Sequence, residues 1–354
     1  MQTVDGLAAK LGASSLTYDM RVDLVDADLN TVRQVDAAPE ASQVTYQADR
    51  TVPFGCSLAL YERLNWSTAL LRPTMIVGDI DVRLGVFVPA WPTEHAGWDR
   101  KRWEVDGYDL TSRLDFPHGR TVTLDEGDPP LDLAEQLAAD RGLVVEFSAK
   151  GDAKVASRDR IWPLDSATTT RSIVNDLLED IGYEPVWMDW QGRLRARPDR
   201  AKSDRGSEWS YDTADDHTTV AADRTLDSNR VDIPNRLVAI SSAATAWDPV
   251  TGDGIAIVED ADDIAAHGER TKVITVDAVD QEELEEKADR RWERARRVVE
   301  TVEFDTLPNP AHWHDDVVRF RDADLGLNRR LSVSSWTLPL DGVTLQTVEG
   351  QVVR

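Results

Sequence analysis

The segment His312-Trp313-His314 is where residue types and spacing first suggest chemistry. On an extended strand, residues two apart point to the same side, so both imidazoles could face one metal ion. Asp315 and Asp316 follow directly, but no separate third ligand is marked. The remaining histidines are scattered, at His95, His118, His217 and His267. We therefore interpret the pair as polar surface and predict no metal site.

Carboxylate pairs recur along the chain, for example at Asp215–Asp216, Asp262–Asp263 and Glu282–Glu283. A glycosidase needs one carboxyl group kept protonated by burial and a second kept ionised across a cleft. Among 65 acidic residues, closeness in sequence does not identify such a pair. The chain also lacks a G-x-S-x-G elbow, a glycine-rich phosphate loop and an H-E-x-x-H motif. We predict no catalytic residues and no enzymatic activity.

Cofactor binding has equally little support in the sequence. The single cysteine, Cys56, excludes an intrachain disulfide and a cysteine-based zinc site, and its apolar neighbours predict burial. The loop 247–254 resembles a calcium loop only loosely and lacks the twelve-residue pattern, so weak cation binding there stays open. We predict no cofactor.

Eight of the twelve tryptophans fall into two groups. Four occupy periodic positions that predict core packing: Trp103, Trp187, Trp292 and Trp336. Four others fall in expected loops and turns: Trp91, Trp98, Trp190 and Trp313. The second group either contacts other subunits or a receptor, or caps a core.

Period-two alternation predicts that residues 1–115 form β-strands. Apolar and polar residues alternate strictly over 16–24 and again over 80–88. Shorter candidate strands lie at 43–49, 56–61 and 101–110. With no long helix between them, this spacing favours a barrel or sandwich.

Residues 116–206 predict a small α/β unit. One helix begins near Pro130 and ends before Gly142, and a second spans 170–181. The second helix has an apolar stripe formed by Ile173, Val174, Leu177, Leu178 and Ile181. A strand at 143–147 and a hairpin at 183–198 complete the unit.

Residues 207–354 return to β patterning, interrupted by one predicted helix at about 280–297. Its apolar stripe comprises Leu284, Ala288, Trp292, Ala295 and Val299, and Glu286–Arg290 and Glu293–Arg297 are supportive i,i+4 pairs. The candidate strands lie at 235–242, 254–260, 272–277, 297–305, 316–320, 329–336 and 343–350.

The net charge of −25 is the strongest compositional feature, and only 7 of the 40 cations are lysine. Such a chain is unsuited to nucleic-acid binding by counterion release, which needs clustered cations. In molar salt the Debye length falls to about 3 Å and the repulsion among acids is screened, so the composition favours a halophilic origin. GC-rich coding is the alternative, but it explains the lysine deficit better than the acid excess.

Targeting signals are not evident. The chain has no run of 18 apolar residues, and its first residues lack the basic start and apolar block of a signal peptide. We expect synthesis in a host cytoplasm without membrane insertion.

The order of these segments resembles the trimeric baseplate hub proteins of tailed phages. Residues 103–114 resemble the strand that closes the first barrel of a hub, and 171–198 resemble its helix-hairpin. Residues 233–241 resemble the strand that opens the second barrel, 282–296 the helix of that barrel, and 316–346 its closing hairpin. The resemblance implies an α+β, mainly β fold of two tail-tube-like β-barrel domains, at 1–115 and 207–354, with an α/β insert domain at 116–206. The chain departs from many hubs in its acidity and in ending soon after the second barrel.

The resemblance also implies a function. A homotrimer at the viral tail tip would adapt the sixfold tail tube to a threefold tip and enclose the genome-ejection channel. Its partners would be the tail tube, distal tail and tape measure proteins and tail-tip fibres or spikes, while DNA passes without stable binding. Together with the acidity, this points to a tailed virus of a haloarchaeon.

Three alternatives stay open at this stage. The chain could be a distal tail ring protein or another tail-tip structural protein, or a tail-tip hydrolase that acts on the host surface layer. A surface adhesin is disfavoured because we find no signal peptide.

The acidity yields a direct prediction. We expect the melting temperature to fall as KCl is lowered from molar concentration to about 0.1 M, where the Debye length grows to about 10 Å. Differential scanning fluorimetry measures this, with sorbitol at matched osmolality as the uncharged control. A melting temperature indifferent to KCl would remove the halophile interpretation.

Overall fold

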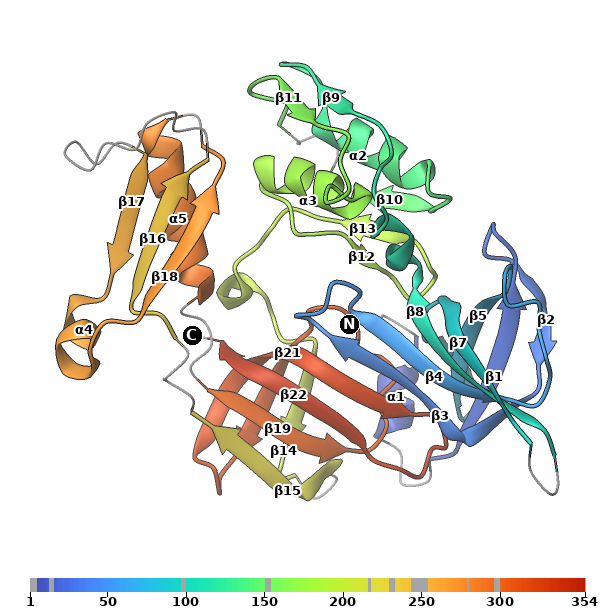
Figure 1. The fold of residues 1–354 in the computed structure, drawn as a ribbon. Helices are drawn as coiled ribbons and strands as arrows, with labels where there is room; N and C mark the ends of the chain where they lie inside the picture. Colours follow the sequence, from blue (N-terminus) through green and yellow to red (C-terminus); the bar gives the residue numbers. More distant parts are fainter. Residues whose placement is uncertain are drawn as a thin grey trace.

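The computed structural model describes residues 5–12, 16–96, 100–149, 154–215, 218–228, 233–242, 254–278, 280–295 and 300–353. It shows a mainly β protein with one large twisted sheet and two smaller α/β units beside it (Figure 1). None of the described helices is long and apolar enough to cross a membrane. The mainly β class predicted from the sequence is confirmed.

The first half of the large sheet is antiparallel and runs in the order β2-β1-β5-β7-β8-β4-β3, with β6 beside β5. A short helix, α1 (Leu7–Leu11), buries its two leucines against this half. The strands are β1 (Tyr18–Val25), β2 (Thr31–Val35), β3 (Ala37–Gln47), β4 (Phe54–Leu60), β5 (Leu70–Val77), β6 (Ile80–Arg83), β7 (Phe87–His95) and β8 (Arg102–Asp109).

The strand predicted over 80–88 is two strands instead of one. β6 ends at Arg83, and β7 begins at Phe87 and pairs with β8. Gly85 lies between them with φ of 97°, a conformation that L side chains rarely adopt. A Cβ at Gly85 would also approach the rings of Trp313 and Phe87 to within 3.2–3.3 Å. The chain therefore turns at this glycine. The turn was not predicted because apolar residues alternate on both sides of it.

The second half of the large sheet runs β15-β19-β22-β21, and β20 pairs with both β21 and β14. Its strands are β14 (Trp209–Asp212), β15 (Val220–Asp227), β19 (Thr301–Thr306), β20 (Val317–Asp322), β21 (Leu327–Pro339) and β22 (Gln346–Val353). One edge of β21 pairs with β22. Its other edge pairs with β20 up to Ser332 and then with β3 from Ser335 onward.

This sharing of β21 corrects the expected pair of barrels. Fourteen of the described strands join into one open sheet, and none of the described strands forms a closed barrel. The two-barrel layout is therefore not confirmed, because β21 continues from the second half directly into pairing with β3 of the first.

The insert follows β8 through a 3₁₀ turn at Leu110–Leu114 and contains two helices, α2 (Pro130–Ala139) and α3 (Thr170–Asp180). Thr169 caps α3 by accepting a hydrogen bond from the Ser172 amide, and the apolar stripe predicted from the sequence is buried. The strands are β9 (Val122–Leu124), β10 (Val145–Phe147), β11 (Arg160–Trp162), β12 (Trp187–Met188) and β13 (Leu194–Ala196), in the sheets β10-β13-β12 and β11-β9. A further 3₁₀ turn at Lys202–Asp204 lies in the linker that follows.

A second α/β unit interrupts the later β region and is called here the α5 module. It comprises β16 (Arg236–Ser241), β17 (Ile255–Glu259), α4 (Ala261–His267), β18 (Thr271–Val276) and α5 (Gln281–Ala295). The strands form a separate sheet in the order β17-β16-β18, and one face of it packs against α5 through Ala239, Ala256, Ala278, Leu284 and Ala288.

Two expectations change in this region. The strand at 233–241 was expected to open a second barrel, but β16 pairs only within this separate sheet among the described strands. The helix predicted over 280–297 is present as α5 with its first three stripe residues buried, whereas Arg297 and Val299 lie outside the described residues. The domain boundaries at 115/116 and 206/207 stay predictions.

The core of the insert can be tested at Leu177, whose side chain is fully buried. We expect Leu177→Asp to lower the free energy of unfolding by about 3 kcal/mol or more, because it places an unpaired charge among apolar side chains. Chemical denaturation measures the loss. The same change at Val155, which is 60% exposed in the same unit, is the control and should be nearly neutral. Equal stability of the two variants would contradict this packing.

Candidate functional site: a buried joint loop

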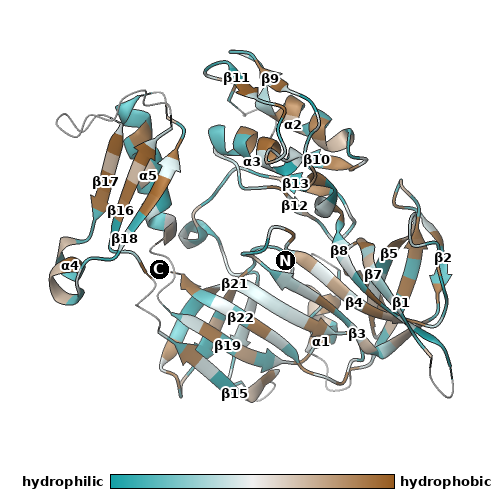
Figure 2. Cartoon of the chain, in the orientation of Figure 1, coloured by the Kyte–Doolittle hydropathy of each residue, from teal (hydrophilic) through white to brown (hydrophobic). Residues whose placement is uncertain are grey.

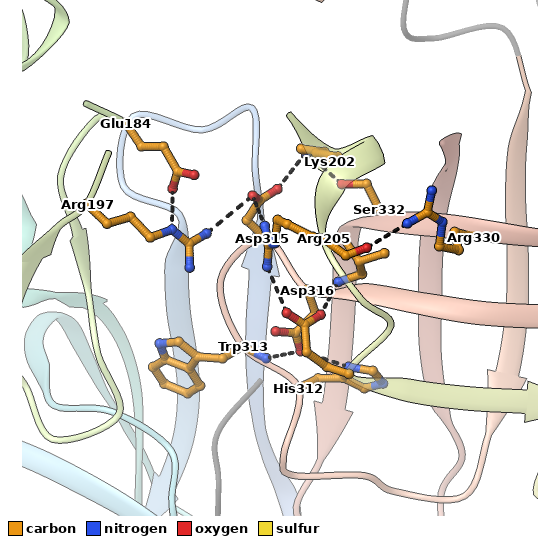
Figure 3. Close-up of polar contacts among 12 residues, drawn as sticks. Glu184, Arg197, Lys202, Arg205, His312, Trp313, Asp315, Asp316, Arg330 and Ser332 are labelled. Carbon is orange, nitrogen blue, oxygen red and sulfur yellow. Dashed lines mark hydrogen bonds and ion pairs between the residues drawn. The ribbon is translucent and has the colours of Figure 1, made fainter. Parts of the chain in front are cut away.

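The loop between β19 and β20 brings the parts of the molecule together. We call residues 309–316 the joint loop; it contains both histidines that the sequence analysis singled out. Figure 3 shows it beside the insert, the linker that follows the insert, and β21. Its side chains contact all three, which makes it the candidate functional site.

Trp313 lies at the centre of the joint loop and is only 2% exposed. Its indole stacks on Phe54 of β4, with ring centroids 4.4 Å apart. Its Nε1 donates a hydrogen bond of 2.8 Å to the carbonyl of Met188 in the insert, and Trp190 packs edge-on against it. Of the two alternatives left open for Trp313, the structure supports core packing over an external contact, because its ring is enclosed within the chain.

His312 is buried in the interior, beside two polar partners. Its Nε2 lies 2.6 Å from the hydroxyl of Tyr211, and its Nδ1 lies 3.2 Å from Oδ2 of Asp316. The same carboxylate oxygen accepts the amide hydrogen of Trp313. Burial acts to raise the pKa of Asp316, but the hydrogen bond from His312 and nearby positive charge hold the pKa below its usual value. These contacts fix the turn of the joint loop.

His314 points toward different partners. Its Nδ1 lies 3.3 Å from the hydroxyl of Tyr46, and its ring stacks on Trp187 of the insert at 4.9 Å. Arg197 lies against the same indole. Burial lowers the pKa of His314 to about 4, so the ring is neutral at neutral pH. The two histidines therefore do not share a ligand, and no group of three His, Cys, Asp or Glu suited to a metal occurs among the described residues.

Asp315 is the ionic centre of the joint loop (Figure 3). Its carboxylate lies 2.5 Å from Nζ of Lys202, 2.7 Å from Nη1 of Arg205 and 3.5 Å from Nη2 of Arg197. Burial acts to raise the pKa of Asp315, but Lys202 and Arg205 outweigh it and hold the pKa below the ordinary aspartate value. One carboxylate therefore holds the end of the insert and the linker against the joint loop.

The cations around Asp315 also contact other residues of the insert and of β21. Arg197 also donates a hydrogen bond to the carboxylate of Glu184, so the insert contributes both a cation and an anion to these contacts. Lys202 donates to the hydroxyl of Ser332 on β21, at 2.6 Å. Arg330 of the same strand donates to the carbonyls of Ser203 and Arg205 in the linker. The linker is thus tied to β21 as well as to the joint loop.

Two comparisons with known proteins found nothing: no protein-family model matches the chain, and no curated protein matches it in sequence. Solved structures do match over nearly the full length. A tail protein from Neisseria meningitidis MC58 superposes with a TM-score of 0.66 at 13% identity, covering 94% of this chain and 96% of that one. The chain shares the fold of that tail protein.

Two prophage proteins share this tail-protein fold. The 43 kDa tail protein of prophage MuSo2 from Shewanella oneidensis gives a TM-score of 0.65 at 13% identity, covering 96% of this chain and 98% of that one. Prophage tail protein gp18 from Listeria monocytogenes EGD-e gives 0.57 at 10% identity, with 94% of each chain covered. At these identities the likeness concerns the fold alone.

Several of the remaining candidate residues occupy structural positions. Asp263 accepts hydrogen bonds from Asn235 and pairs with His267 and Arg270, which ties α4 to its own sheet. Cys56 is buried as predicted, and so are three of the four expected core tryptophans: Trp187, Trp292 and Trp336. Trp103 and Trp190 are half-buried and Trp91 is 64% exposed. Asp216, His217, Trp98 and loop residues 247–253 lie outside the described residues.

Sequence reasoning did not single out several residues of this site: Tyr46, Glu184, Arg197, Lys202 and Arg205. Tyr46 lies far along the chain from the other four, and no motif links the five positions. The one usable signal was the cluster of two histidines and two aspartates at 312–316, which identified the loop without identifying its role.

The ionic centre can be tested by Asp315→Asn. We expect the free energy of unfolding to fall by about 2 kcal/mol, because three partly buried cations lose their shared partner. The effect is smaller than for a fully buried pair because Lys202 and Arg197 are each about one third exposed, at 31% and 32%. Urea denaturation measures it, with Asp28→Asn at an exposed turn as the control. A cost no larger than that of the control would contradict the assigned role.

Proposed function

We propose that the chain is a structural protein of a viral tail and forms a trimeric baseplate hub at the tail tip. The observation that carries the proposal is the match to tail proteins over at least 94% of both chains in three cases. A match of that extent includes the large sheet, the insert and the α5 module, so the likeness is not confined to one common motif.

The large sheet supports the proposed trimer. Each chain supplies two β-rich halves, and β3 and β21 join them edge to edge. Three copies would present six such units around an axis, which matches a sixfold tail tube to a threefold tip. A ring of this kind needs a constant angle between the halves, and the buried joint loop holds both halves and the insert together through Trp313 and Asp315.

A scaffold role agrees better with the joint loop than hydrolysis does. A tail-tip hydrolase needs an acid or a base that reaches a cleft. The side chains of His312 and Asp316 form the closest histidine–carboxylate pair at the joint loop, and both are 0% exposed. They stabilise the loop but have no access to a substrate, so we propose a non-enzymatic role.

The proposed partners are those of a hub: the tail tube, distal tail and tape measure proteins, and tail-tip fibres or spikes. DNA would pass through the ring without stable binding, because a chain with a net charge of −25 offers phosphates few anchors. We retain the tailed virus of a haloarchaeon as the proposed source on the acid excess alone, since the matching structures named above come from bacteria.

The assembly is the decisive test. We expect purified protein in molar KCl to have the mass of three chains by light scattering, and to show threefold rings in electron micrographs. The lumen should exceed the roughly 20 Å width of duplex DNA, since the genome must leave through it. A sixfold ring would instead favour the distal tail protein, and a monomer across all salt concentrations would contradict the hub.

A further inference from the structure

A cleft of about 450 Å³ lies between the first half of the large sheet and the insert. The sheet lines it with the turn between β1 and β2, with Arg72 of β5 and with Arg83 of β6. The insert lines it with residues 144–146 and with Gln191 and Arg193 of the turn between β12 and β13. Three arginines therefore line one cleft in a chain whose net charge is −25.

Arg72 interrupts a strand that is otherwise largely apolar. β5 has the sequence LLRPTMIV and is coloured mostly as hydrophobic in Figure 2. Arg72 is only 3% exposed. Leu70, two residues earlier and hence on the same side of the strand, belongs to the core of the insert. The side chain of Arg72 therefore points from the sheet toward the insert.

The guanidinium of Arg72 has too few partners for a buried cation. Its Nη2 donates a hydrogen bond of 2.6 Å to the carbonyl of Leu29, but its Nε is buried with no hydrogen-bond partner. The register pairs Arg72 with Asp23 of β1, yet the carboxylate of Asp23 forms its ion pair with Arg21, at 3.3 Å. No carboxylate of the described residues lies within the 4.0 Å of an ion pair with Arg72. A buried cation without a counter-charge is costly, so an anion from outside the chain would stabilise this position.

Arg83 adds a second positive charge beside the first. It pairs in register with Thr74, which lies on the same side of β5 as Arg72, so both arginines point to one side of the sheet. Burial and the charge of Arg83 lower the pKa of Arg72, although Asp23 and Asp26 act in the opposite direction. The two guanidinium groups therefore repel each other at the cleft.

The other charges of the cleft leave this excess in place. Glu146 is shared between Arg193 at 2.6 Å and Arg195 at 2.7 Å, so its carboxylate is already balanced. Asp28, in the exposed turn, is the other acid among the described lining residues. The lining also includes three neutral side chains that can donate hydrogen bonds: Asn30, Thr31 and Gln191. Cationic forks surrounded by neutral donors suit a ligand rich in negatively charged oxygen atoms.

We propose that this cleft binds a phosphate group, with Arg72 and Arg83 as its cationic ligands. Phosphate carries about two negative charges at neutral pH and so balances both arginines, whereas a carboxylate balances one. Its oxygen atoms also match the planar fork of a guanidinium. The source is free phosphate, because Arg72 is too deeply buried for the backbone of duplex DNA to reach it. The inference does not depend on the proposed hub.

The test is calorimetric titration of inorganic phosphate into the full chain in molar KCl, where chloride is present as the rival anion. Arg83 is exposed, so we expect Arg83→Gln to fold with the circular dichroism of the wild type. We expect this variant to bind phosphate at least about tenfold more weakly, because a charge-assisted contact is lost. Arg72→Gln should abolish binding, and Arg83→Lys should restore part of it. Arg50→Gln, at the exposed turn between β3 and β4, makes the same charge change and should bind as the wild type does.

The outcomes decide the assignment. Absence of phosphate binding by the wild type in molar KCl, or equal binding by the wild type and Arg83→Gln, overturns it. A short DNA duplex is the second probe and should not bind. Binding of the duplex without binding of free phosphate would also overturn the proposal, because the site would then recognise a nucleic-acid backbone. The cleft lies within one chain, so a monomeric protein that binds phosphate would contradict the hub and support this inference.

Discussion

The pairing of β21 with β3 is the interaction on which the rest of the structure depends. A strand of thirteen residues divides one of its edges between β20 and β3, so the two β-rich halves become one hydrogen-bonded surface. The pairing brings Trp336 opposite Tyr46, and Tyr46 in turn contacts His314 and the amide of Asp315. The position of the joint loop is therefore a consequence of this strand register.

The joint loop holds the two halves of the sheet and the insert in one arrangement. Aromatic stacking supplies the apolar contacts, and Trp313 is enclosed between β4 and the insert. Polar groups in such an interior are costly unless they are paired, and here the buried histidines and Asp315 each have named partners. Movement at this loop would change the angle between the two halves.

The distribution of cations follows from the acidity of the chain. The chain has 40 basic residues against 65 acidic ones, and several of the bases join units that would otherwise repel each other. Arg197, Lys202 and Arg205 converge on Asp315, and Arg158 and Arg291 link the insert to the α5 module. Salt acts on these internal contacts in the opposite direction to the overall repulsion, because screening at high KCl weakens partly exposed ion pairs.

The sequence by itself determined the local elements whose patterning is strong. The helix α3, the hairpin of β12 and β13, and the strands β1 and β8 follow from apolar periodicity and from caps, which act over a few residues. β5 was not predicted because nearly all of its side chains are buried, which removes the alternation that marks a half-exposed strand. Only the tertiary structure decided that β21 joins the two halves, that β16 belongs to a separate sheet, and that His312 and His314 face different partners. Strand pairing and burial depend on contacts between residues far apart in the chain, and a periodic pattern contains no information about which distant strand supplies the partner.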